Sequence, residues 1–89
     1  MTTTIEDFMV ALNAKYPNRP RVFTTGKRYW KICDARDGRG VSAYAFVDKA
    51  TGNLYKPASW AAPAIHERGN INDPSGLEAC QEYSVKYLN

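Results

Sequence analysis

The run Val41–Asp48 constrains the fold more than any other stretch of this chain, because apolar residues occupy both of its alternating faces. Successive side chains of a strand point to opposite faces of a sheet, so apolar bulk on both faces is typical of a central strand. The segment Asp48–Asn53 contains turn-forming residues, and Gly52 suits a relaxed hairpin loop. We therefore expect strands on both sides of this run, at Lys27–Ala35 and at Asn53–Pro57.

Simple alternation assigns the side chains of these strands to two faces. In the first strand it separates Tyr29 and Lys31 from Trp30. In the central run it places Tyr44 on the same face as Phe46.

The ends of the sheet are marked by turn residues and by a proline. Asp37–Gly40 predicts a tight hairpin turn, and Arg21–Thr25 could begin a short strand before it. Because Pro57 has no amide proton to donate, Asn53–Pro57 is expected to be an edge strand or to end at the proline.

The N-terminal stretch predicts a helix from Thr4 to about Lys15, with Thr3 as the capping residue and Glu6 completing a capping box. One apolar stripe recurs at helical spacing and comprises Ile5, Phe8, Met9, Leu12 and Tyr16. Pro17 disfavours helical geometry in the residue before it, so the helix should end there.

The remaining segments carry weaker patterns. Ala58–Ser75 shows no sustained period and predicts a long ordered loop. Leu77–Gln81 favours a helical turn, followed by a C-terminal element that is either extended or helical. We therefore predict an α+β fold for residues 1–89 as a single domain, with the N-terminal helix packed on an antiparallel three-stranded meander.

The composition is that of a globular chain, with 44% hydrophobic and 24% charged residues and a formal net charge of +3. Eight of the 12 Lys and Arg residues lie between Lys15 and Arg39, against only two carboxylates in that segment. The N-terminus lacks the positive start and apolar core of a signal peptide, and no apolar run has the length of a membrane span. We expect a soluble protein made in the cytosol, with no membrane partner.

Few residues suit catalysis or metal binding. Cys33 and Cys80 are far apart in sequence and are expected to be reduced, buried thiols. With His66 as the single histidine, the chain lacks the closely spaced ligands of a zinc site and a base paired to a nucleophile. We therefore predict no metal, no cofactor and no enzymatic activity.

The strongest candidate contact face is the first predicted hairpin, where basic and aromatic residues interleave. Positive side chains contact a nucleic-acid backbone, and flat rings stack on its bases. The alternative is that the rings build the core and the charges only keep an open face solvated. The candidate partner-binding residues are Lys27, Arg28, Tyr29, Lys31, Arg36, Arg39 and Tyr44.

A second candidate region is the predicted loop that contains Trp60, His66 and Arg68. A loop tryptophan can anchor a protein partner, or it can close the open end of a small core. The small alanines around Trp60 favour the second interpretation, a structural plug. Arg68 is expected to pair with a carboxylate or with backbone carbonyls in a structured turn.

The middle third of the chain also carries a dense set of motifs: Phe46-Val47-Asp48-Lys49, Thr51-Gly52, Lys56-Pro57-Ala58-Ser59-Trp60, Ala62-Pro63-Ala64 and Arg68-Gly69-Asn70-Ile71. This set resembles a family of small uncharacterised proteins encoded by tailed bacteriophages. The resemblance implies a phage origin and a location in the host bacterial cytoplasm or the virion. It implies no activity and no site residues.

Two functions remain open. The favoured one is a small basic protein-binding module of phage type, which inhibits a host factor or defence system or is a component of the virion. The alternative is a single-stranded nucleic-acid-binding accessory that uses the basic and aromatic hairpin between residues 27 and 46. The oligomeric state stays open.

Overall fold

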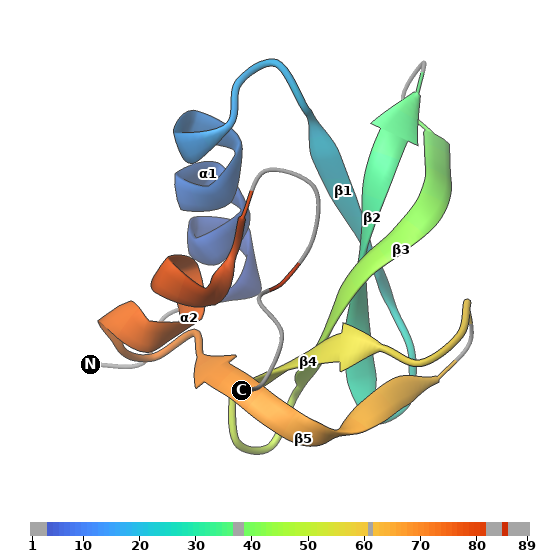
Figure 1. Ribbon diagram of the computed structural model, residues 1–89, viewed down its shortest axis with the longest axis vertical. Coiled ribbons are helices and arrows are strands. Elements are labelled where there is room, and N and C mark those ends of the chain that lie inside the picture. Colours follow the sequence, from blue (N-terminus) through green and yellow to red (C-terminus); the bar gives the residue numbers. More distant parts are fainter. Residues whose placement is uncertain (1–3, 37–38, 61, 82–84, 86–89) are drawn as a thin grey trace.

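Five antiparallel strands in the order β1-β2-β3-β4-β5 form the body of the fold in a computed structural model of the chain. The structure describes residues 4–36, 39–60, 62–81 and 85. The elements are α1 (Ile5–Lys15), β1 (Arg21–Thr25), β2 (Tyr29–Arg36), β3 (Arg39–Asp48), β4 (Asn53–Pro57), β5 (Pro63–Asn70) and α2 (Pro74–Ala79). Figure 1 shows both helices on one side of the sheet, with β4 and β5 crossing steeply below β1, β2 and β3.

The predicted α+β fold with a three-stranded meander is therefore wrong, because the chain is mostly β. A fifth strand, β5, lies within the region predicted to be a long loop, and it pairs with β4 from Asn53↔Asn70 to Pro57↔Pro63. Consequently β4 is an internal strand of the sheet and not an edge. Part of what holds β5 is an Asn70 side chain, whose amide donates to the Thr51 carbonyl at 2.8 Å and to Asn53 Oδ1 at 2.9 Å.

The hairpin loop after β3 follows the prediction from sequence. Asp48 Oδ1 accepts hydrogen bonds from the amides of Ala50 and Thr51, which closes the turn. Gly52 has a φ of 79°, in the left-handed region where a side chain is strained. The turn therefore needs its glycine, and it sets the register in which β4 returns along β3.

The predicted N-terminal helix is confirmed as α1, with a shift of one residue at its start. Thr4, and not Thr3, is the N-cap, and its hydroxyl accepts from the Asp7 amide at 3.1 Å. Thr3 lies outside the described residues. The buried residues of the helix are Ile5, Phe8, Met9 and Leu12, four of the five residues of the predicted apolar stripe. The fifth, Tyr16, is the C-cap and is half-buried.

A β-bulge in β3 alters which side chains face the core. Consecutive residues of β2 pair with Ala43 and Ala45, so Tyr44 is an extra residue in β3. Both Tyr44 and Ala45 belong to the hydrophobic core, whereas Phe46 is buried outside that cluster. The prediction that Tyr44 shares a face with Phe46 is therefore wrong, because the bulge interrupts the simple alternation.

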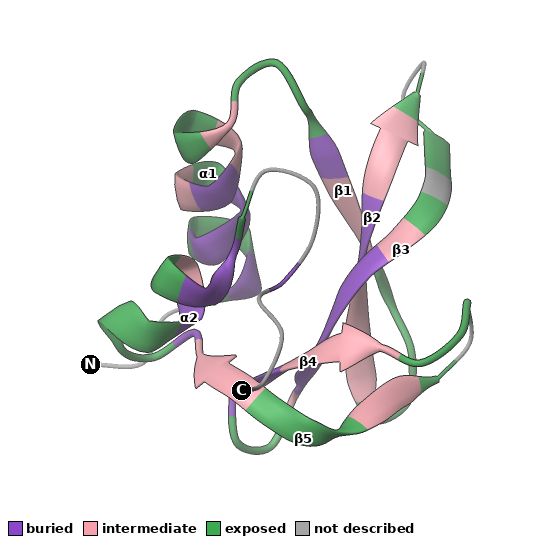
Figure 2. Ribbon diagram, viewed as in Figure 1, coloured by how far each residue is buried: buried purple, intermediate pink, exposed green. Residues whose placement is uncertain are grey.

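The core fills the space between the helices and the sheet face that they cover, which we call the inner face; the opposite face is the outer face. Figure 2 shows buried residues on the sides of α1 and α2 nearest the sheet and along the middle of β2 and β3. The C-terminal residues Cys80 and Val85 form an isolated β-bridge and are fully buried. They close the core next to α1.

The second helix begins at Pro74 and not near Leu77 as the sequence predicts, with Asp73 as its N-cap. Hydrogen bonds from Ser75 lower the pKa of the Asp73 carboxyl. Gly69 of β5 and Gly76 of α2 lie so close to the opposite backbone that neither position leaves room for a Cβ atom. The helix therefore docks directly on β5. The choice between an extended and a helical end concerns residues that lie mostly outside the described part of the chain.

Candidate functional site

The outer face of the sheet carries a small aromatic cluster, which we call the outer cluster: Tyr29, Phe46 and Tyr55. The Tyr29 ring meets Phe46 edge to face, with a centroid separation of 6.0 Å and an interplanar angle of 80°. It meets Tyr55 in the same way at 6.1 Å and 86°. Phe46 is buried beneath the two half-buried tyrosines. This arrangement buries the ring of Phe46 on a face that the helices do not cover.

Lys31 connects the outer face to the loop between β4 and β5. Its ammonium nitrogen lies 3.6 Å from the centroid of the Trp60 ring and donates to the Trp60 carbonyl at 3.0 Å. A cation over an indole face is attracted by the ring quadrupole, by about 0.5–1 kcal/mol at an exposed site. Lys31 therefore holds the loop against the sheet and covers one part of the tryptophan.

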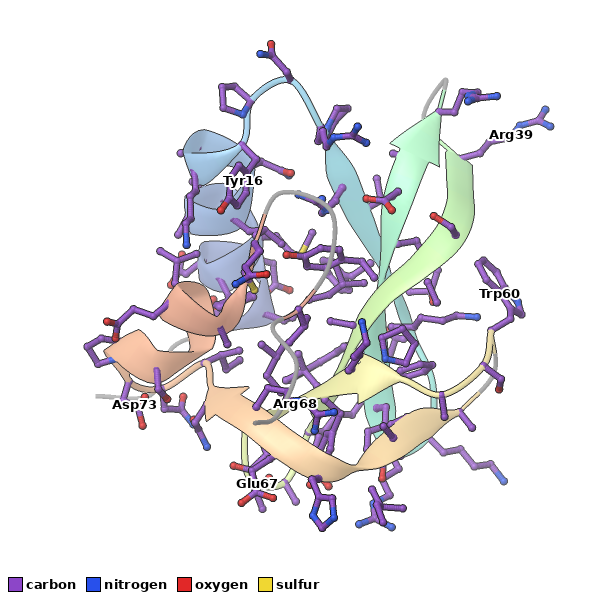
Figure 3. The ribbon with its side chains drawn as sticks, viewed as in Figure 1. Tyr16, Arg39, Trp60, Glu67, Arg68 and Asp73 are labelled. Atoms are coloured by element: carbon purple, nitrogen blue, oxygen red, sulfur yellow. The ribbon has the colours of Figure 1, made fainter. Side chains whose placement is uncertain are left out.

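Trp60 itself is 52% exposed, so the interpretation of this residue as a core plug is wrong. Ile65 in β5 is exposed to 86%. Among the described residues, only Val10 on α1 joins them as an exposed large hydrophobic side chain. We define the hairpin tip as residues 58–60 and 62–65, which comprise the described part of the connection after β4 and the first three residues of β5. It projects away from the helices (Figure 3).

The predicted basic hairpin is divided between two places. Lys27 and Arg28 are exposed beside a hollow of about 280 Å³ that Tyr29, Lys31 and Phe46 also line. Arg28 Nε lies 3.3 Å from Asp48 Oδ2, an ion pair in which the Arg28 side chain is 72% exposed and the Asp48 side chain is buried.

Arg36 and Arg39 lie at the opposite end, where β2 and β3 begin their pairing, and both are exposed. Figure 3 shows Arg39 projecting on the same side of the molecule as Trp60. The two arginines and the Lys27–Arg28 pair therefore do not form one continuous cluster.

Tyr44 is absent from this face because it is buried on the inner face. The Arg21 guanidinium lies 3.9 Å from the centroid of its ring, and Arg21 Nε donates to Asp34 Oδ1 at 2.9 Å. Ser42 Oγ donates to the second oxygen of Asp34 at 2.9 Å. The Tyr44 hydroxyl donates to the Gln81 carbonyl, which ties β3 to the C-terminal segment.

The buried thiols and phenol are not poised for chemistry. Burial raises the pKa of the Tyr44 hydroxyl and raises the pKa of Cys80 to about 11. Burial also raises the pKa of Cys33. Because a thiolate is the nucleophilic form of cysteine, these groups are unreactive near neutral pH. The prediction that both cysteines are buried is confirmed.

The remaining loop candidates lie on β5. His66 is exposed, and its backbone carbonyl accepts a hydrogen bond from the Arg68 guanidinium. This agrees with the expectation that Arg68 pairs with a backbone carbonyl, but the expected turn is wrong, because Arg68 lies in the strand β5. Within the described part of the chain, no group of three or more His, Cys, Asp or Glu side chains could hold a metal ion. Neither described helix is long and apolar enough to cross a bilayer.

Sequence reasoning missed Ile65 and Tyr55. The signal for Ile65 was present, because it follows directly on the run of small apolar residues Ala61-Ala62-Pro63-Ala64. This pattern could be interpreted as an exposed apolar group only once β5 was known to be an edge strand of the sheet. Tyr55 pairs with Phe46 across β3 and β4, so a correct register would have placed it in the outer cluster.

A family model built from related sequences matches residues 6–88. The chain belongs to DUF7717, a family of unknown function. The match begins inside α1 and includes the hairpin tip, the outer cluster and the basic residues of β2 and β3. No curated protein and no solved structure matches the chain.

Proposed function

We propose that this member of DUF7717 is a non-enzymatic module that binds another protein through the hairpin tip and the adjoining Lys31. The observation that supports the proposal is the exposure of Trp60 and Ile65 on one hairpin. Exposed apolar groups that lie together on a soluble protein mark interaction sites more often than single ones do. Tryptophan is also among the residues that contribute most to protein interfaces.

The contacts around Trp60 suit an interface anchor. Lys31 restrains the ring before any partner arrives, so less side-chain entropy is lost on binding. A hollow with a volume of about 320 Å³ lies beside it. It is lined by β3 and by Pro57, Ala58, Ser59 and Trp60. A restrained indole next to a shallow hollow gives a partner both a knob and a recess.

The biological setting is part of the same proposal. The motif resemblance described above supports a tailed-phage origin and action in the host bacterial cytoplasm, where a chain of 89 residues can act by occupying the surface of a larger protein. The partner would then be a host factor, a defence protein or another phage protein.

A second candidate function is binding of single-stranded nucleic acid. The feature that favours it is the hollow lined by Lys27 and Arg28 together with Tyr29 and Phe46. Base stacking requires open ring faces, however. Phe46 is buried, and Tyr29 meets both Phe46 and Tyr55 edge to face. Protein binding is therefore the better supported function.

The test compares two exposed aliphatic side chains on different elements. Ile65→Ser and Val10→Ser each remove a large exposed group, at 86% and 71% exposure respectively, so both should leave the fold intact. The immobilised proteins are used to capture partners from a nuclease-treated bacterial host lysate. We expect Ile65→Ser and Trp60→Ala to lose the captured protein, while Val10→Ser retains it.

Equal capture by all four proteins, wild type included, would contradict the role of the hairpin tip. A second measurement addresses nucleic acid directly. Binding of single-stranded DNA or RNA that falls steeply with salt, and that weakens in Lys27→Glu but not in Ile65→Ser, would favour the alternative function.

A further inference from the structure

The first half of β3 has an open edge. β3 pairs with β2 along its whole length, from Arg36↔Arg39 to Tyr29↔Asp48. It pairs with β4 only at Phe46 and Val47. Among the described residues, no strand therefore pairs with the other edge of β3 between Arg39 and Ala45. Such an edge presents backbone N–H and C=O groups that can pair with another chain.

The hairpin tip borders this open edge. The hollow of about 320 Å³ is lined on one side by Ser42 and Ala43 of β3 and on the other by residues from Pro57 to Trp60. Gly40 and Ser42 are exposed, so the edge itself is accessible. A chain that lay along β3 would place alternate side chains in the hollow, beneath Trp60.

The charge beside the edge selects the partner. Arg36 and Arg39 lie at its start, and Lys31 lies near its Trp60 end. The nearest described carboxylate on these strands, Asp34, is engaged by Arg21 and Ser42 on the inner face. An extended segment with acidic residues would therefore find complementary charge, which favours association and excludes basic partners.

A second copy of the chain fits this edge poorly. Pairing between two copies would bring the arginines of both near one another, which is unfavourable. The two register shifts between β2 and β3 also fall in this half of the strand. Bulges twist a strand and hinder indiscriminate edge-to-edge pairing. The edge is thus suited to a short extended segment and not to another sheet.

We propose that the open edge of β3 from Arg39 to Ala43 binds an extended acidic segment of a partner protein as an added strand, with apolar side chains of that segment in the hollow beside Trp60. This mode of recognition derives affinity from backbone hydrogen bonds and specificity from pockets for alternate side chains. The inference rests on the proposed function, because it names the class of partner at the same surface.

The probe is a fluorescent hexapeptide of alternating glutamate and valine, titrated into the full-length protein. Its matched control carries N-methyl groups on alternate amides along one edge, which removes the hydrogen-bond donors while keeping charge and side chains. We expect the acidic peptide to bind and to slow amide exchange between Gly40 and Ala43 at least about tenfold. The N-methylated peptide should bind at least about tenfold more weakly.

Two substitutions test the role of charge. Arg39→Glu should weaken peptide binding about tenfold, whereas Arg19→Glu, an equal charge change in the connection between α1 and β1, should leave binding unchanged. Peptide binding without protection of β3 amides would overturn the inference, as would equal binding of the N-methylated peptide. Protection of these amides by a concentration-dependent dimer in the absence of peptide would also overturn it.

The two proposals fail in different ways. If the acidic peptide does not bind at about 1 mM while Ile65→Ser still abolishes partner capture, the strand-addition inference is overturned and the hairpin tip remains the binding surface. If the peptide protects β3 while Ile65→Ser and Trp60→Ala capture the partner as well as wild type, the hairpin tip is excluded and strand addition at β3 is retained.

Discussion

On each face of the sheet a basic side chain lies close over an aromatic ring, and the two pairs have similar geometry. On the inner face, the Arg21 guanidinium lies 3.9 Å from the centroid of Tyr44. On the outer face, the Lys31 ammonium lies 3.6 Å from the centroid of Trp60. Their surroundings differ: Arg21 is buried and also pairs with Asp34, whereas Trp60 is half exposed.

The difference shows that burial, more than contact geometry, determines what such a pair contributes. A buried guanidinium has lost its water and depends on its protein partners, so removing one partner is costly. The members of an exposed pair exchange contacts with water for contacts with each other, so the pair contributes little to stability. The inner pair therefore serves the fold, and the outer pair is available for recognition.

The largest effect should come from removing the buried cation. Arg21→Met keeps the apolar stem but leaves Asp34 and Tyr44 without the guanidinium, so we expect a loss of about 3 kcal/mol in unfolding free energy. Arg28→Met is the matched control, because Arg28 also pairs with an aspartate through Nε, but the Arg28 side chain is 72% exposed and the buried Asp48 keeps hydrogen bonds from two backbone amides. It should cost less than about 1 kcal/mol. Urea denaturation of both variants measures this, and equal losses would break the comparison.

An intermediate effect is expected at alkaline pH, and on the inner face it comes from Cys80 and Tyr44. Folding raises the pKa of the Cys80 thiol from 9.0 to about 11 and raises that of Tyr44. A raised pKa favours the protonated form in the folded state. Stability from Cys80 is therefore complete below pH 9 and is lost as the pH rises through about 11. The steepest loss should be about 1.4 kcal/mol per pH unit for one group.

Denaturation under reducing conditions across this range, for wild type and for Cys80→Ala, checks the expectation. The variant should lose the contribution of Cys80 to the decline above pH 9. A decline that is identical in wild type and in Cys80→Ala would assign the pH dependence to other groups.

The smallest effect on stability should come from the outer pair. Lys31→Met removes the cation over Trp60 and the hydrogen bond to its carbonyl, and we expect a cost of about 0.5–1 kcal/mol. The same variant should shift the NMR signal of the Trp60 indole N–H, because the restraint on the ring is lost. A loss of unfolding free energy near that of Arg21→Met would mean that the contact between Lys31 and Trp60 stabilises the fold as strongly as the buried pair does.

Much of the first half of the fold could be predicted from sequence. The apolar stripe of α1, the alternation in β2 and the Gly52 turn are local signals, and each depends on residues close in the chain. The position of Tyr44 could not be predicted, because the bulge depends on the pairing of β3 with β2. Alternation within one strand contains no information about an extra residue.

The second half was harder to predict because its structure depends on distant contacts. β5 contains Pro63, Gly69 and polar residues, none of which favours a strand. It forms because β4 offers an edge and because Gly69 permits close contact with α2. The exposure of Trp60 is likewise a property of the whole fold, since an alanine-rich setting suits a buried or an exposed ring equally well.

The separation of the hairpin tip from the core has an evolutionary consequence. Trp60 and Ile65 are exposed, and the turn that sets the register of β4 lies at the other end of that strand. If the tip binds a partner as proposed, sequence drift there is limited by that partner and not by whether the chain folds. Where the partner changes during evolution, substitutions in the tip can alter binding while the rest of the fold is kept. Members of the family are therefore expected to diverge most in residues 58–65.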